Sequence, residues 1–281
     1  MFNFPSPLAA SAALFASLYA APTWALSTVT YVSGKGADTG ACASPASACR
    51  TFGFAINQTS AGGEIVALDP ANYGPVTITK SISIEGVDGA KIAGIPSGGN
   101  GITINAGKTD VINISRLTID GGKTAQSGIS TALVGGTFGS LTVTHSTIQN
   151  FCDGIDILQL SGKVFLIADV VVSDNTAIGL DLVGVPGTLD HVTVNHNGGA
   201  RSSCPSSVVS GSIRAAEAAA VVSIVASTVA NNAAPIDSDD GATVRLYLSF
   251  IPDGVQSTGG TFLSAGNNFI PAAGLTEVGT H

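Results

Sequence analysis

The sequence has little charge and few aromatic rings. Of its 281 residues, only 11% are Asp, Glu, Lys or Arg and 6% are aromatic, and the single tryptophan, Trp24, lies near the amino terminus. Disordered chains combine high charge with low hydrophobicity, so this composition excludes disorder. Surface helices need a charged face, so the composition also excludes long amphipathic helices. The scarcity of rings disfavours a long sugar groove lined by aromatic side chains.

The charges that are present are mostly negative. The formal net charge is −8, and a surface of this sign repels phosphate backbones, which excludes nucleic acid as a partner. The chain contains 35 glycines among many Val, Ile and Thr residues. This combination indicates short apolar strands joined by tight turns, and the length favours one large all-β domain.

Residues 1–25 contain no charged side chain, and residues 8–21 form an apolar run of small residues. This pattern predicts a secretory signal peptide, although a positively charged front end is missing. The alternative is a membrane anchor, which the shortness of the run disfavours. We therefore expect residues 26–281 to form a single secreted or periplasmic domain, monomeric and free of the membrane after cleavage.

The chain has four cysteines, an even number that suggests two disulfides in an exported protein. Cys42 and Cys49 flank a short Ser/Pro/Ala loop, which makes their pairing the simpler expectation. No C-x-x-C spacing is present, so a zinc site is not expected.

The second half of the chain contains a repeat of about two dozen residues. Each unit has an apolar alternation, a polar break, a second short strand, an Asn or Asp turn, and a third strand that opens with Gly-Ile or a similar pair. The units begin at residues 112, 141, 165, 189, 224 and 244. Three short strands per unit predict one coil of a right-handed parallel β-helix, a solenoid whose inward residues stack from coil to coil. Ile148, Val172, Val194 and Val229 should then form one interior file.

The region before the repeat suggests a cap. Residues 47–59 place Phe52, Ala55 and Ile56 on one face of a short helix that would cover the first coil, with the coils spanning about residues 62–271. Residues 61–74 and 76–86 resemble the opening of β-helix proteins of the pectate-lyase superfamily, and residues 260–270 resemble a last coil of the same kind. The resemblance extends over roughly residues 28–271.

Stacking would align outward residues of successive third strands in one strip. The aligned residues are Ser130, Asp156, Asp181, Arg214, Asp237 and Gln256. The alignment of Arg214 is the least regular, because 33 residues separate it from Asp181, whereas 25 separate Asp181 from Asp156. Neighbours in such a strip lie roughly 5 Å apart.

The strip suggests two kinds of chemistry. Closely spaced carboxylates are ligands for Ca²⁺, and their mutual repulsion raises a pKa when no metal is bound. The resemblance to the superfamily implies a Ca²⁺-dependent polysaccharide lyase, with Asp156, Asp181 and Asp237 as metal ligands, Asp156 also contacting substrate, and Arg214 and Asp237 as catalytic groups. Glycosidases of the same fold use aspartates as acid and base, so a glycoside hydrolase is the second enzyme class that the resemblance implies. The alternative is that these polar residues serve only solubility.

A second alignment contains Arg116, His145, Asp169 and His191 at the polar break of each unit. His145 and His191 are candidate substrate-binding residues, since histidine titrates near neutral pH. The other interpretation is a polar ladder in which these side chains bond to the turn backbone.

Cys152 and Cys204 fall at the turn before the third strand, two coils apart. A direct bridge would span roughly 10 Å, beyond disulfide reach, unless residues 197–210 fold back across the intervening coil. We expect this bridge, with two free thiols as the alternative.

The sequence thus predicts an extracytoplasmic β-helix that contacts acidic polysaccharide, either as a Ca²⁺-dependent lyase or as a binding-only relative. A structural or adhesive rod without an active site is the competing hypothesis. The signatures that distinguish polygalacturonases and pectate lyases within the superfamily are missing.

Overall fold

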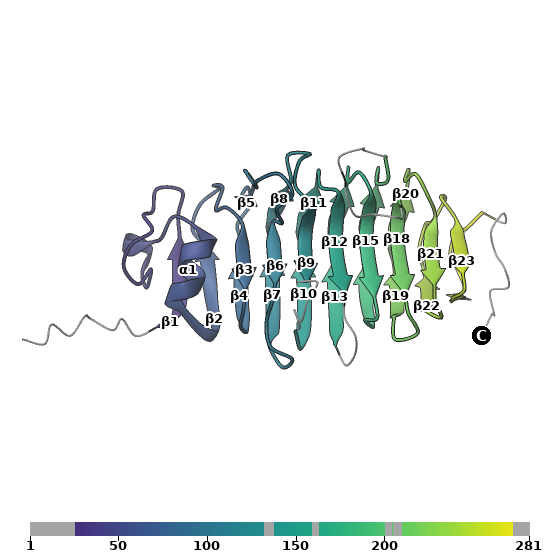
Figure 1. Ribbon diagram of the computed structural model, residues 1–281, viewed down its shortest axis with the longest axis horizontal. Helices are drawn as coiled ribbons and strands as arrows, with labels where there is room; N and C mark the ends of the chain where they lie inside the picture. The colour runs from purple at the N-terminus through teal and green to yellow at the C-terminus, as the bar shows by residue number, and fades with distance from the viewer. Residues whose placement is uncertain (1–25, 132–137, 159–162, 200–203, 205–209, 272–281) are drawn as a thin grey trace, which may run out of the picture.

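The computed structural model describes residues 26–131, 138–158, 163–199, 204 and 210–271; the expected signal peptide lies outside them. These residues form a right-handed parallel β-helix, as predicted, with about 50% strand and 4% helix. Figure 1 shows the coils stacked along the long axis of the molecule. All strand pairings within the three sheets are parallel, and each sheet collects one strand from successive coils.

Sheet A contains ten strands within the described residues. They are β1 (Ser27–Val32), β2 (Thr59–Ala67), β4 (Ile82–Glu85), β7 (Val111–Ser115), β10 (Ser140–Thr144), β13 (Val164–Ala168), β16 (Gly187–Asp190), β19 (Val221–Val225), β22 (Thr243–Tyr247) and β24 (Thr261–Ala265).

Sheet B contains six shorter strands in the same part of the chain. They are β5 (Lys91–Ile92), β8 (Thr118–Asp120), β11 (Thr147–Gln149), β14 (Val171–Ser173), β17 (Thr193–Asn195) and β20 (Thr228–Ala230).

Sheet C contains the remaining eight described strands. They are β3 (Val76–Ile78), β6 (Ile102–Ile104), β9 (Ser127–Thr131), β12 (Asp153–Leu158), β15 (Ile178–Val183), β18 (Gly211–Ala216), β21 (Ile236–Asp239) and β23 (Val255–Thr258).

The interior file predicted from the repeat is present in sheet B. Ile148 pairs with Val172, Val172 with Val194, and Val194 with Val229, and all four side chains are fully buried. Each inward position therefore packs on its equivalents above and below, which removes apolar surface from water along the whole axis.

The amino-terminal end is capped as expected, but the solenoid begins earlier than the coils predicted from residue 62. Strand β1, which precedes the cap in the sequence, pairs with β2, which follows the cap. The cap consists of a 3-10 turn, η1 (Pro45–Ser47), and helix α1 (Phe52–Gln58), which buries Phe52, Ala55 and Ile56. Figure 1 shows α1 at the purple end.

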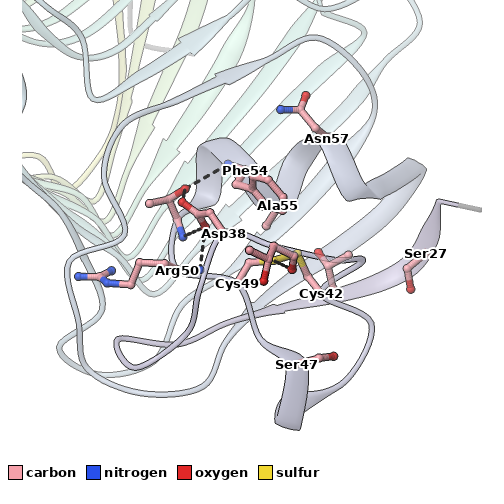
Figure 2. The surroundings of a disulfide bond; sticks show 12 residues. Ser27, Asp38, Cys42, Ser47, Cys49, Arg50, Phe54, Ala55 and Asn57 are labelled. Carbon is pink, nitrogen blue, oxygen red and sulfur yellow. Dashed lines mark hydrogen bonds between the residues drawn. A yellow bond between two sulfur atoms is a disulfide. The ribbon is translucent and has the colours of Figure 1, made fainter. Parts of the chain in front are cut away.

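A disulfide-closed loop, whose surroundings Figure 2 shows, bonds to the carboxy-terminal part of β1. Cys42 and Cys49 are bonded, and the backbone groups of Tyr31 exchange hydrogen bonds with both cysteines at 2.8 Å. Asp38 fixes the end of this loop, since its carboxylate accepts bonds from the backbone N–H groups of Arg50 and Thr51 at 2.8 and 2.9 Å.

A buried polar ladder exists, but it does not lie where we expected it. The side chains of Arg116, His145, Asp169 and His191 stand at left-handed turn positions between sheets A and B, and their described bonds go to carboxylates or histidine rather than to backbone.

The ladder lies instead at the turn between sheets B and C, and contains Asn175, Asn197, Asn232 and Asp253. Asn197 Oδ1 accepts bonds from the N–H and the Nδ2 of Asn175, and its own Nδ2 donates to Asn232. In this turn a residue with a left-handed backbone, such as His196, points outward. The residue after it, such as Asn197, faces the turn backbone and forms the ladder.

Replacing Asn197 with Ala should lower the free energy of unfolding by about 3 kcal/mol. The change leaves the buried N–H of Asn175 and the carbonyl of Val172 without partners, and each buried unpaired group costs on the order of 1–3 kcal/mol. Denaturant titration followed by circular dichroism measures the loss. The matched control is Asn113→Ala, an exposed strand asparagine whose removal should change stability little. Equal effects of the two substitutions would contradict a stabilising ladder.

Candidate functional site

The outward strip predicted on the third strand of each coil is a continuous column on sheet C. The register pairs Ser130 with Asp156, Asp156 with Asp181, Asp181 with Arg214, Arg214 with Asp237, and Asp237 with Gln256. The irregular alignment of Arg214 is thus confirmed. We call this column the sheet C strip.

The glycine two positions before the strip residue is required because a side chain there would clash with the neighbouring coil. A Cβ on Gly154 would lie 2.5 Å from the carbonyl oxygen of Gly179 and 2.6 Å from Val172 Cγ1, so a side chain cannot fit there. The next residue, Ile155, is fully buried, and alternation then turns Asp156 outward. The Gly-Ile pair therefore sets the direction of the carboxylate.

Asp156 and Asp181 form a pair of neighbouring, partly buried carboxyl groups. Burial raises the pKa of Asp156 to about 7, and the negative charges of Asp181 and Asp153 add to the rise, whereas Ser130 opposes it. Burial also raises the pKa of Asp181, but the charge of Arg214 and its hydrogen bond to Asp181 oppose that rise. Below about pH 7, Asp156 therefore favours its protonated form, and the carboxyl group can exchange this proton near neutral pH.

Arg214 joins the strip to a residue that the sequence analysis did not assign to it. Its Nη1 lies 3.1 and 3.4 Å from the two carboxylate oxygens of Asp181, and its Nη2 lies 3.4 Å from Asp239 Oδ2. Asp239 follows Asp237 by two positions on β21, and this spacing, which puts both on one strand face, was the signal available in the sequence. The guanidinium is thus held by two carboxylates.

Asp153 is a second residue that sequence reasoning missed. Its side chain is buried, Gln126 Nε2 donates to its Oδ2 at 3.0 Å, and its Oδ1 has no hydrogen-bond partner. Burial raises its pKa to about 6; the hydrogen bond from Gln126 opposes the rise, and the charge of Asp181 adds to it. Asp153 is the first residue of β12 and directly precedes the Gly-Ile pair, so the repeat pattern alone does not single it out.

Asp237 is separated from the other two proposed metal ligands. Arg214 occupies the position between Asp181 and Asp237, and the nearest bond of Asp237 is from Thr258 Oγ1, 2.6 Å from its Oδ1. In the part of the chain that the structure describes, no group of three or more His, Cys, Asp or Glu residues is placed to hold a metal ion.

His145 and His191 do not join the strip. They lie at the turn between sheets A and B, where His145 Nε2 is 3.6 Å from Asp169 Oδ2 and His191 Nδ1 is 2.8 Å from Asp190 Oδ1. Both histidine side chains are more than 60% exposed, and they contact different carboxylates. The two histidines therefore have separate partners and are not joined to each other by a described contact.

The Cys152–Cys204 disulfide is present, as expected, with a Cα–Cα distance of 5.6 Å. Cys204 reaches back over the intervening coil, since its Sγ lies 3.0 Å from Thr176 Oγ1 and the N–H of Ala177 bonds to the carbonyl of Cys152. Cys152 directly precedes Asp153. The bridge thus holds Cys204 beside the buried carboxyl group.

A pocket opens next to the carboxy-terminal half of the strip. Its polar lining includes Arg214, Asp237 and Gln256, and its apolar wall includes Ile178, Ala234 and Pro235. We call it the Arg214 pocket.

Comparisons of the sequence with protein-family models and with curated proteins, and of the fold with solved structures, find no match. Among the described residues, no helix is both long enough and apolar enough to span a membrane. The two disulfides are compatible with an oxidising, extracellular location.

Asp156→Asn should stabilise the protein at pH 8 and change its stability little at pH 4. The folded state raises the pKa of Asp156 to about 7, so between pH 4 and 7 it binds a proton that the unfolded chain releases. Stability contributed by this proton is complete below the unfolded pKa and is lost as pH rises to 7. Asn imitates the protonated acid at every pH. Thermal unfolding midpoints across this range measure the effect.

Asp169→Asn, at an exposed turn, is the matched control and should leave the pH dependence of the wild type intact. If Asp156→Asn instead destabilised the protein equally at pH 4 and pH 8, the protonated state of Asp156 would be refuted.

Proposed function

We propose that this protein is a glycoside hydrolase that cleaves polysaccharide on sheet C. The observation that supports the proposal is the register of Asp156 with Asp181, which sets two partly buried carboxyl groups on adjacent strands. Hydrolysis of a glycosidic bond needs one carboxylic acid and one carboxylate beside the scissile bond. The raised pKa of Asp156 and the contact of Arg214 with Asp181 suit these two roles.

In the first step, the protonated Asp156 donates its proton to the glycosidic oxygen while a carboxylate oxygen of Asp181 attacks the anomeric carbon. The carbon–oxygen bond to the leaving sugar breaks, and an ester to Asp181 forms. In the second step, Asp156, now ionised, takes a proton from water, and the resulting hydroxide displaces Asp181. The site returns to its starting protonation state, and Arg214 balances the charge that Asp181 regains.

The proposal includes membership of the pectate-lyase superfamily and export from the cytoplasm. The parallel β-helix, its amino-terminal cap and the two disulfides support it. A signal peptide in residues 1–25 and a secreted or periplasmic location belong to the same proposal.

The second candidate is a Ca²⁺-dependent lyase that acts on acidic polysaccharide. The placement of Arg214 between Asp181 and Asp237 favours it, because a cation there is suited to stabilise charge on a uronate during proton abstraction. Calcium would need Asp156, Asp181 and Asp237 together, whereas Arg214 lies between the last two. We therefore rank hydrolysis first.

Asp156→Asn and Asp181→Asn should each lower the rate of polysaccharide cleavage by 10²–10⁴-fold, because each removes a group that transfers a proton or attacks carbon. The assay measures reducing ends released from a panel of neutral and acidic polymers, with and without calcium. Asp169→Asn is the matched control and should keep the wild-type rate.

Unsaturated uronate products that require calcium would favour the lyase instead. A wild-type protein that neither cleaves nor binds any polymer would leave the structural or adhesive rod as the better interpretation.

Cleavage should proceed with retention of anomeric configuration. Adjacent strands lie about 4.8 Å apart, which agrees with the ~5–5.5 Å carboxyl separation of retaining enzymes and not with the ~6.5–9.5 Å of inverting ones. Proton NMR of the first product formed identifies its anomer before mutarotation. An inverted product would exclude Asp181 as nucleophile while leaving Asp156 as the acid.

A further inference from the structure

We propose that the polymer bound on sheet C is uncharged and that the Arg214 pocket holds one of its sugar rings through hydroxyl groups. The inference rests on the proposed function, since it names the substrate class of the same site. It is argued from the charges, the hydrogen-bonding groups and the walls of the pocket.

The charge around the pocket does not suit an acidic polymer. Asp181, Asp237 and Asp239 surround Arg214, which is the one cationic side chain among the described residues of the strip and the pocket. Both terminal nitrogens of Arg214 already contact carboxylates. A uronate placed there would meet Asp237 without an unpaired cation to balance it, and like charges at such distances repel.

Arg214 and Asp237, which both line the pocket, carry one polar atom that needs an acceptor and one that needs a donor. Arg214 Nε is buried and has no hydrogen-bond partner, so it needs an acceptor. Asp237 uses Oδ1 for its bond from Thr258, and its second oxygen accepts from any donor that enters. A hydroxyl group can donate and accept, whereas a carboxylate can only accept. The combination therefore selects sugar hydroxyls.

The wall of the pocket suits the remaining surface of a sugar ring. Ile178, Ala234 and Pro235 add apolar atoms to the pocket lining. The faces of a pyranose ring carry C–H groups, while its edge carries hydroxyls. A site of this kind combines apolar contact with a few placed polar groups, as small-ligand sites do.

The pocket lies beside the reacting pair rather than on it. Asp237 is two strands from Asp181 in register, which corresponds to roughly 10 Å along the axis. The ring in the pocket is therefore a neighbour of the sugar that Asp156 and Asp181 would cleave. Binding of this ring would hold the neighbouring glycosidic bond in place between Asp156 and Asp181.

The test measures binding of end-labelled hexasaccharides to the full protein by fluorescence polarisation. The probes are cellohexaose, xylohexaose, mannohexaose, hexagalacturonate and hexaguluronate. At least one neutral probe should bind ten-fold or more tightly than both uronates. Equal or tighter binding of a uronate would overturn the inference, and so would the failure of every probe to bind.

Asp237→Asn keeps the shape of the pocket and removes one charge. It should weaken binding of the preferred neutral probe about five- to ten-fold and reduce the difference in affinity between that probe and the uronates. Asp169→Asn should change neither affinity. Gln256→Ala, at an exposed position, is a second variant and should weaken the neutral probe as well. Unchanged affinity in both pocket variants would refute the pocket as the binding site.

The two proposals fail separately. Binding of a neutral probe without cleavage would refute the proposal that the protein is a hydrolase and would leave the proposal of an uncharged ligand standing. Cleavage of a uronate polymer by Asp156 and Asp181 would refute the proposal of an uncharged ligand and would leave the proposed hydrolase activity standing.

Discussion

Parallel pairing in register between successive coils is the constraint on which the whole molecule depends. It carries a residue onto its equivalent in the next coil even where the chain between them lengthens, as between Asp181 and Arg214. Strand β18 pairs with β15 in register despite the longer stretch of sequence between them. The core, the buried ladder and the sheet C strip are three results of this one geometry.

The same pairing holds two carboxyl groups close together although their negative charges repel each other. Asp156 and Asp181 are adjacent because their backbones pair, and the hydrogen bonds of the coils hold them there. A protein stabilised by its sheets can retain such a pair, together with the unpaired oxygen of Asp153, at a cost in stability. The raised pKa values at the strip therefore follow from burial and from the register that the fold imposes.

The sequence predicts the stacking well, because apolar alternation and Gly-Ile pairs are local signals that repeat. It predicts Asp156 and Arg214 for the same reason. It does not predict Asp153 or Asp239, since their roles depend on how deeply a turn is buried and which way a long side chain reaches, and neither is local. The polar ladder lies one turn further along the coil than expected, because the residues expected to form it, such as His145, have left-handed backbones that turn their side chains outward.

The closed edge of β1 gives the rod a direction. The loop closed by Cys42 and Cys49 occupies the outward backbone groups of Tyr31 and the N–H of Ser33, which another strand would otherwise use. This pairing disfavours the addition of a foreign strand to the carboxy-terminal part of β1. Because both cysteines are fully buried in the core, loss of this bond in a reducing environment would loosen the covering of β1 and the amino-terminal end of the core together.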